Sequence, residues 1–281
     1  MEWPSERPDP ATSFAVTKRR VLPTFQLDRA PATDDNAVYP SRRRDVVIFV
    51  HGYNYAFQES LFRLAQIATH GGLDEAPILF AWPSAASVTG YVADRDAITY
   101  SRDDLVRLLT IVTNSPDVGR ITLFGHSMGA MLLAEALRQL RLTGRDRSIE
   151  RLEDVVLAAP DIDIDVFRAQ MEIIGRLDPP MTLLVAPDDR ALRVSARLAG
   201  SRSRVGSRDV RDAQVQALAA VNGIRVIDIS EVSAPDATRH SRFVELVTVF
   251  PRLRTEGRGT IAQTGAFLLQ PLTAVLVPPH R

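Results

Sequence analysis

The stretch Ile121-Thr122-Leu123-Phe124-Gly125-His126-Ser127-Met128-Gly129-Ala130 contains a serine with a glycine two residues away on each side. The mostly apolar run before it, 121–124, is typical of a strand buried on both faces of a parallel sheet. The segment after it, 128–140, has helical spacing of its apolar residues. The stretch therefore predicts a sharp turn from a buried strand into a helix, with Ser127 at the turn.

The two glycines have a physical reason in such a turn. Side chains at Gly125 and Gly129 would collide with the neighbouring strand and helix. The turn raises the Ser127 hydroxyl above the carboxyl edge of the sheet, where open α/β folds bind ligands. It also directs the Met128 amide, at the start of a helix, toward an oxyanion. Chance alone gives this five-residue pattern to about one chain in ten, so its weight depends on the rest of the chain.

The same alternation of strand and helix recurs along the chain, and it predicts a mostly parallel sheet with helices on both faces. Apolar runs typical of buried strands lie at 46–50, 78–82, 121–124, 155–159, 181–186 and 224–229. Helical patterns lie at 57–69, 102–112, 128–140, 164–174, 191–199, 210–220 and 241–253. One helical segment separates Ala159 from Thr182, so we expect little or no cap domain.

Composition narrows the class of protein. The chain has 281 residues and equal numbers of basic and acidic residues, 34 of each, so no overall charge favours nucleic acid. It has no cysteine, which excludes disulfides, thiolate metal sites and a cysteine nucleophile. We expect an irregular segment over 1–44 with short early strands at 13–16 and 21–27, an α/β domain over 45–255, and a tail over 256–281 that packs on the body.

The two ends of the chain bear on its location. The N-terminal MEWPSERPDP is polar and rich in proline, without a signal-peptide core, so we expect a cytoplasmic protein. The apolar segment 265–278 is shorter than the roughly 20 residues that a membrane-spanning helix needs. We therefore expect no integral membrane segment, with peripheral membrane contact of the tail as the alternative. The arginines of 42–44 and 202–211 are expected on solvated loops, and the oligomeric state stays open.

A serine nucleophile requires a base, and the base requires a carboxylate to orient it. His240 is the candidate base, because it lies in a polar loop after the last predicted strand and before the last helix. The order serine, acid, histidine along the chain also fits this assignment. The other histidines are expected to be structural or terminal: His51, His70, His126 and His280.

Two loops at strand ends offer the acid. Asp188 and Asp189 follow the strand predicted at 181–186, and we expect Asp188 to cap the next helix and Asp189 to reach His240. Asp188 and Asp161 remain alternatives for the acid. The other interpretation of Asp161, and of Asp163 beside it, is a helix cap or a first-turn charge.

The loop after the first predicted strand, His51-Gly52-Tyr53-Asn54, is expected to complete the oxyanion hole through the amide of Tyr53. We expect His51 to shape this loop rather than to take part in chemistry. Trp82 and Tyr91 are predicted to wall an acyl or alcohol pocket, with packing in the core as the alternative. Asp94 to Asp96 are expected to open the next helix.

At these residues the sequence resembles a group of bacterial α/β-hydrolases, the DUF900 family. The resemblance covers roughly residues 45 to 255. The matching stretches are 49–54, 80–84, 125–129, 158–163, 189–192 and His240. It favours Asp189 over Asp188, because an aspartate two residues before Ala-Leu recurs in the family. It implies the α/β-hydrolase fold and esterase-like hydrolysis.

Together these features predict a serine hydrolase that cleaves a carboxylic ester of a small molecule through an acyl-enzyme. Ser127, His240 and Asp189 form the triad, the amides of Met128 and Tyr53 form the oxyanion hole, and no metal or organic cofactor is expected. The alternatives are a thioesterase, lipase or amidase, or a binding or scaffold protein on a hydrolase fold.

Overall fold

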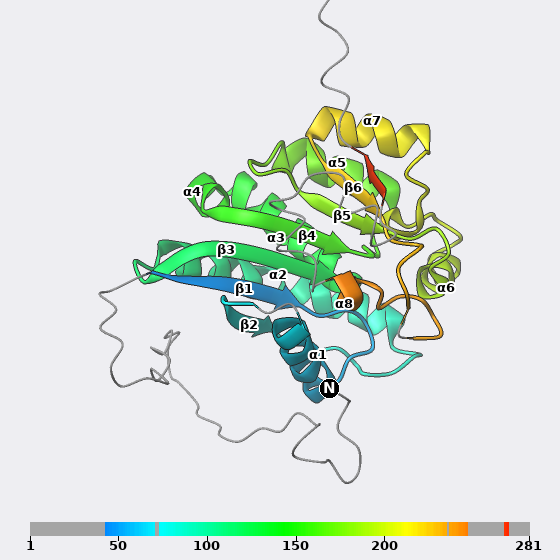
Figure 1. The fold of residues 1–281 in the computed structure, drawn as a ribbon, viewed down its shortest axis with the longest axis horizontal. Helices are drawn as coiled ribbons and strands as arrows, with labels where there is room; N and C mark the ends of the chain where they lie inside the picture. The colour runs from blue at the N-terminus through cyan, green and yellow to red at the C-terminus, as the bar shows by residue number, and fades with distance from the viewer. Residues whose placement is uncertain (1–42, 71–72, 235, 247–266, 270–281) are drawn as a thin grey trace, which may run out of the picture.

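A single twisted sheet forms the centre of the protein (Figure 1). The computed structural model describes residues 43–70, 73–234, 236–246 and 267–269. The strand order is β2-β1-β3-β4-β5-β6-β7; strands β1 to β6 are parallel, and β7 pairs antiparallel with β6. The strands are β1 (Arg44–Val50), β2 (Ala76–Phe80), β3 (Val118–His126), β4 (Leu152–Ala158), β5 (Thr182–Val185), β6 (Arg225–Asp228) and β7 (Phe267–Leu269).

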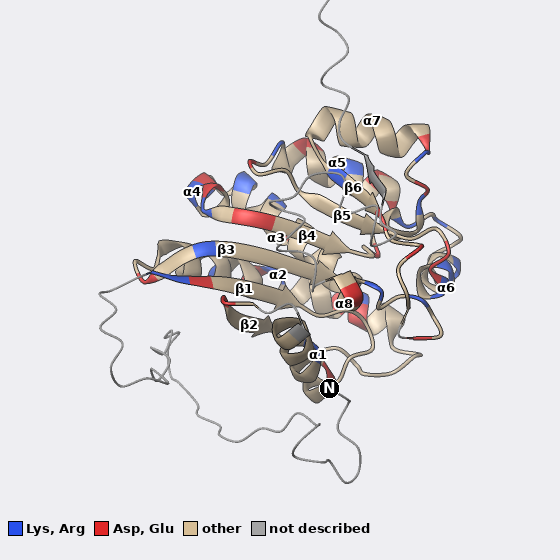
Figure 2. Ribbon diagram, in the orientation of Figure 1, with Lys and Arg blue, Asp and Glu red and all other residues tan. Residues whose placement is uncertain are grey.

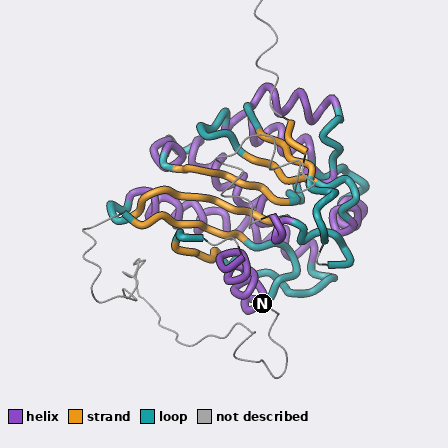
Figure 3. Tube along the Cα trace, in the orientation of Figure 1, coloured by secondary structure: helices purple, strands orange, loops and turns teal. Residues whose placement is uncertain are grey.

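Helices cover both faces of this sheet (Figure 3). They are α1 (Phe57–His70), α2 (Tyr91–Asn114), α3 (Met128–Leu142), α4 (Asp146–Glu150), α5 (Ile164–Ile174), α6 (Arg190–Leu198), the 3-10 turn η1 (Val205–Ser207), α7 (Ala213–Asn222) and α8 (Phe243–Leu246). Side chains of alternate strand residues point to opposite faces. In β1, Val46, Ile48 and Val50 join the core with α2, α3, α5 and α7. Phe49 joins a second core with α1 and α8.

The order of the strands indicates where a ligand would bind. From β1 the chain goes outward to β2, then returns to β3 on the other side of β1 and continues outward through β4, β5 and β6. The order thus reverses between β1 and β3, and in open α/β sheets ligands bind in the crevice at the carboxyl ends of the strands at such a point. Ser127 follows directly on β3.

The predicted mostly parallel sheet with helices on both faces is confirmed, and each of the six predicted runs overlaps one parallel strand. Between β4 and β5 the chain adds the single helix α5. Helix α2 differs from its prediction because it starts at Tyr91, so Asp94 lies within its first turn. The short helix α4 and the turn η1 were not predicted.

Some predictions fall outside the described residues. These include the early strands at 13–16 and 21–27, and the end of the helix predicted at 241–253. Of the C-terminal tail, the structure describes only β7, whose backbone pairs with β6. None of the helices in the described part of the chain combines the length and the apolar composition that a membrane crossing requires.

Gly129 allows α3 to pack against the end of β1, and its replacement is a test of this packing. A Cβ atom there would lie 2.2 Å from the carbonyl oxygen of Val50 and 2.3 Å from that of His51. We expect Gly129→Ala to lower the free energy of unfolding in denaturant by about 3 kcal/mol, at the upper end of overpacking costs. Gly144→Ala is the control, because Gly144 has a φ of +67° with open space around it, and left-handed strain costs only about 1 kcal/mol. Equal losses in the two variants would contradict this account.

Candidate active site

Ser127 is the single residue between the end of β3 and the start of α3, and its backbone is strained. Its φ is 55° and its ψ is −119°. A non-glycine residue in such a conformation costs of order 1–3 kcal/mol and persists only where its surroundings hold it. Its N–H donates to Ala158 O at 2.9 Å, and its carbonyl accepts from Asp161 N at 3.2 Å and from Ala130 N at 3.1 Å. Backbone groups on both sides thus hold the turn predicted around Ser127.

The loop between β1 and α1 passes directly beside the serine. A Cβ atom on Gly52 would lie 2.9 Å from His126 Nδ1 and 3.0 Å from Ser127 Cβ, so a larger residue would require a neighbour to shift. Tyr53 follows Gly52, so its amide belongs to the same loop. Met128 is the first residue of α3, and the first N–H groups of a helix have no acceptor within it. Both predicted oxyanion donors therefore belong to segments that adjoin Ser127.

His240 and Asp189 are in direct contact. His240 Nδ1 lies 2.6 Å from Asp189 Oδ2, and Asp189 is 1% exposed. The other carboxylate oxygen, Oδ1, accepts from Leu192 N at 3.0 Å, so Asp189 is also the N-cap of α6. The expectation that Asp188 caps this helix is therefore wrong. Asp189 performs both tasks, because its two oxygens face different elements.

Asp188 instead joins the loop after β5 to the segment that carries His240. It accepts from Arg242 Nη2 at 2.8 Å and from Arg239 Nη1 at 2.6 Å. These guanidinium groups, Arg242 first, lower the pKa of Asp188 to about 2. Arg242 is buried, and its Nε donates to Val232 O at 2.9 Å. Asp188 thus binds the arginines on both sides of His240, and Asp189 contacts His240 itself.

Asp236 orders the rest of that segment. Its side chain accepts from His240 N at 3.3 Å and from Ser241 N at 2.8 Å. Burial raises the pKa of Asp236, but the hydrogen bonds from Thr238, Ser241 and His240 outweigh burial and lower it to about 2. The backbone of His240 is therefore fixed independently of its ring.

The environment of His240 favours its protonated form. Burial lowers the pKa of its imidazole, but the charge and hydrogen bond of Asp189, with smaller effects of Asp161 and Asp236, outweigh burial. The net effect raises the pKa of His240 above 6.5. Since a carboxylate only accepts, Nδ1 carries the proton in the neutral ring, which leaves Nε2 as the basic atom.

His126 precedes Ser127 in the chain and contacts His240. Its ring centroid lies 4.6 Å from that of His240, and its Nε2 lies 3.3 Å from His240 O. A carbonyl only accepts, so Nε2 carries the proton, and Nδ1 has no hydrogen-bond partner among the described residues. Burial, then the charge of His240, lowers the pKa of His126 well below 6.5. His240 thus packs on a neutral residue adjacent to Ser127.

Asp161 belongs to a separate buried group. Its Oδ1 lies 3.0 Å from Arg204 Nε, and both side chains are 2% exposed. The Nε–H is not aligned with this oxygen, so the contact is an ion pair rather than a hydrogen bond. Tyr91 and Ser195 donate their hydroxyls to the same carboxylate at 3.1 and 2.9 Å. The interpretation of Asp161 as a helix cap and the expectation that Arg204 lies on a solvated loop are therefore wrong.

Asp163 has the capping role that was predicted for it. It is the N-cap of α5, where its side chain accepts from Asp165 N at 3.0 Å. Arg202 pairs with the same carboxylate at 2.6 Å and is the first cause that lowers the pKa of Asp163 to about 2.

His51 and Trp82 hold the loop beside Ser127. Their rings stack with centroids 4.8 Å apart, and Trp82 Nε1 donates to His51 O at 2.8 Å. Trp82 N donates to His51 Nε2 at 3.2 Å, so the proton of the neutral ring is on Nδ1, which lies 2.9 Å from Gly52 O. His51 therefore contacts loop backbone, as expected for a residue that shapes the loop.

Tyr91 and Trp82 are both buried, at 5% and 3% exposure. The Tyr91 hydroxyl donates to Asp161, and its ring meets Tyr53 edge-on with centroids 5.6 Å apart. The Tyr53 hydroxyl donates to Val88 O. Each predicted pocket residue thus contacts the loop after β1, Trp82 at His51 and Tyr91 at Tyr53, and contact with a substrate stays a prediction.

Asp94 has a structural role that its sequence pattern did not indicate. It is fully buried and accepts from Ala85 N at 2.6 Å, Ser84 Oγ at 2.7 Å and Asn54 N at 3.4 Å. It thereby joins the loops after β1 and β2. An aspartate near a predicted helix start is typical of a first-turn charge, so its pattern gave no signal of this contact.

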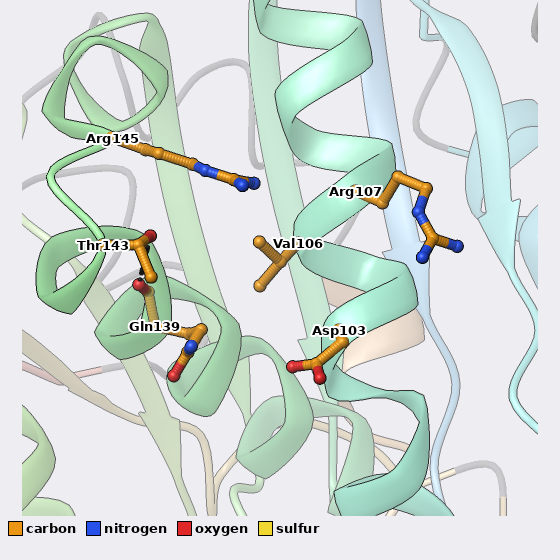
Figure 4. A pocket seen from close by; sticks show the side chains of 6 residues that line it. All are labelled: Asp103, Val106, Arg107, Gln139, Thr143 and Arg145. Carbon is orange, nitrogen blue, oxygen red and sulfur yellow. Dashed lines mark hydrogen bonds between the residues drawn. The ribbon is translucent and has the colours of Figure 1, made fainter.

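A surface depression lies away from these residues, between α2 and α3 (Figure 4). It has a volume of about 260 Å³ and is lined by Asp103, Val106, Arg107, Gln139, Thr143 and Arg145. Gln139 is roughly 18 Å along α3 from Ser127, at 1.5 Å per residue. This depression therefore belongs to a different part of the surface. Within the described ranges, no group of three or more histidine, aspartate or glutamate side chains is arranged to hold a metal ion.

Comparisons with solved structures give distant matches. An uncharacterized protein from Bacillus cereus has 12% identity and a TM-score of 0.44; the match covers 71% of this chain and 55% of that protein. A putative hydrolase from Agrobacterium vitis has 15% identity and a TM-score of 0.38, over 64% of this chain and 87% of that one. The thioesterase RedJ from Streptomyces coelicolor has 14% identity and a TM-score of 0.32, with 57% and 80% covered.

The comparison with curated proteins finds no match. A family model does match, over residues 32–257, and its description is an α/β-hydrolase of unknown function, DUF900. The matched range holds the turn at Ser127, the contact of Asp189 with His240, and all six parallel strands. The chain belongs to the DUF900 family of α/β-hydrolases.

Proposed function

We propose that this protein is a serine hydrolase that cleaves a carboxylic ester of a small molecule through an acyl-enzyme. The observation that carries the proposal is the 2.6 Å contact of Asp189 with His240, whose ring packs on the residue adjacent to Ser127. A histidine oriented by a carboxylate, together with a serine in a strained strand-to-helix turn, is the set of residues that activates a hydroxyl for acyl transfer.

The first half of the reaction forms the acyl-enzyme. Ser127 Oγ attacks the ester carbonyl carbon while His240 Nε2 takes the hydroxyl proton. The carbonyl electrons move to oxygen, and the amides of Met128 and Tyr53 stabilise this oxyanion. The intermediate then collapses, the bond to the alcohol oxygen breaks, and His240 returns its proton to the leaving alcohol.

The second half releases the acid. Water attacks the acyl group on Ser127, His240 takes the proton of the water, and a second oxyanion forms at the same two amides. Collapse of this intermediate frees Ser127 Oγ, which regains its proton from His240. Asp189 stabilises the imidazolium that forms twice in each cycle, consistent with the raised pKa of His240.

The loops around Ser127 support the proposed oxyanion hole and pocket. The stack of His51 on Trp82 fixes the loop that carries Tyr53, and Asp94 joins it to the loop after β2. We propose Trp82 and Tyr91 as walls of the acyl or alcohol pocket, because each contacts the loop that carries Gly52 and Tyr53.

A fluorophosphonate probe tests the nucleophile, because it reacts only with an activated serine. We expect the wild-type protein to gain the mass of one phosphonyl group and Ser127→Ala to gain none. A panel of p-nitrophenyl esters of increasing acyl length then measures ester turnover, which the same variant should abolish. Absence of both labelling and turnover in the folded wild type would favour the binding or scaffold alternative. Labelling without ester turnover would direct the search to thioesters or amides.

Asp189→Asn and Asp161→Asn form a matched pair for the acid. An amide in place of the acid stabilises the wrong tautomer of His240, so we expect Asp189→Asn to lower kcat on the best ester by about 10⁴-fold. Asp161→Asn should keep kcat within about tenfold but lower the unfolding free energy by about 3–5 kcal/mol, because it leaves Arg204 buried without its partner.

If Asp161→Asn does not fold, the double variant Asp161→Asn/Arg204→Met removes both charges and allows the same kinetic comparison. Loss of turnover in the Asp161 variants with retention in Asp189→Asn would show that the acid is assigned wrongly.

A further inference from the structure

The segment from Arg190 to Arg208 has six arginines and no acidic residue. The structure divides them into two groups. Three form ion pairs with aspartates elsewhere: Arg202 with Asp163 at 2.6 Å, Arg204 with Asp161 at 3.0 Å, and Arg208 with Asp212 at 2.6 Å. The other three, Arg190, Arg193 and Arg197, all lie in α6 and are exposed. No carboxylate among the described residues forms an ion pair with any of these three.

These three arginines share one face of α6. At 100° per residue, Arg190, Arg193 and Arg197 fall within an arc of about 60°. The next arc of the same exposed surface holds two aliphatic side chains, Val194 at 51% and Leu198 at 59% exposure. The opposite side of the helix carries its buried residues, Leu192 and Ser195, so α6 is fixed to the body with this face outward. We call these five exposed residues the α6 face.

The α6 face adjoins the candidate active site. Asp189, which contacts His240, is the N-cap of α6, and Arg190 N donates to Thr238 O at 2.9 Å. Figure 2 shows α6 at the edge of the molecule, with its basic residues among the loops at the carboxyl end of the sheet. The nearby Asp188 does not offset this charge, because Arg239 and Arg242 already bind it.

We propose that the α6 face docks the protein on an anionic lipid surface. Arginine side chains are attracted to anionic headgroups, and each basic residue near such a surface strengthens binding by roughly fivefold. Exposed aliphatic side chains beside them enter the boundary between headgroups and acyl chains. Nucleic acid offers Val194 and Leu198 no apolar environment. The combination of arginines and aliphatic side chains on the α6 face therefore favours binding to a bilayer over binding to nucleic acid.

The net charge of the whole chain does not by itself favour binding to an anionic surface. Basic and acidic residues are equal in number, so the protein as a whole has no formal net charge to draw it to an anionic surface. Binding should therefore depend on the α6 face itself. The proposal does not rest on the proposed hydrolase function, because it concerns binding alone.

Vesicle flotation of the full chain tests the proposal, with phosphatidylcholine vesicles compared with mixtures of phosphatidylcholine and phosphatidylserine. We expect binding to the mixture alone, weakened by salt. Arg193→Gln/Arg197→Gln should weaken binding on the order of 25-fold. Val194→Ser/Leu198→Ser should weaken it without changing the charge. All four side chains are exposed, so we expect both variants to fold, with circular dichroism as the check.

The matched control is Arg107→Gln/Arg168→Gln, which removes the same charge from exposed arginines paired on other helices. This variant should bind as the wild type does. Equal binding to both kinds of vesicle, or an equal loss in the control, would overturn the proposal. So would binding to duplex DNA as tight as to the mixed vesicles and unchanged by Val194→Ser/Leu198→Ser.

Discussion

The backbone of Ser127 is the constraint on which the rest of the site depends. A φ of 55° is unfavourable for serine, and the turn persists because β4, the loop after it and α3 hold both of its peptide groups. The same sharp turn brings Gly129 against β1 and places the serine close to Gly52 in the loop beside it. One strained residue thus determines how a strand, a helix and a loop meet.

The aspartates around His240 bind different partners, and one of them contacts its ring. Four aspartates lie near the base, but each has its own partners: Asp161 pairs with Arg204, Asp188 pairs with Arg239 and Arg242, and Asp236 accepts hydrogen bonds from the backbone of its loop. Asp189 is the carboxylate that contacts the His240 ring. The other three aspartates are thereby held by arginines or by loop backbone, and burial lowers the pKa of His126 beside His240.

Much of this fold was predictable because buried parallel strands have simple apolar runs, and each of the six runs overlaps a strand. The start of α2 was missed because its first turns, from Tyr91, mix polar and apolar residues without a clear stripe. The buried pair of Asp161 and Arg204 was missed for another reason. Arginine is almost always exposed, and the contact joins residues 43 positions apart, which no local pattern indicates.

The roles of two adjacent aspartates were the hardest to assign from the sequence. Asp188 and Asp189 occupy the same loop, and capping was assigned to the first of them although the second provides it. Sequence order cannot resolve this, because the choice depends on which carboxylate faces His240 and which faces Arg242 across more than 50 residues of chain.

NMR titration of the histidine imidazoles tests whether Asp189 orients His240 as a base. We expect a pKa above 6.5 for His240 that falls in Asp189→Asn, because the carboxylate stabilises the protonated ring. His126 should stay neutral through this titration. A His240 pKa at or below 6.5 that is unchanged by Asp189→Asn would show that Asp189 does not have this role.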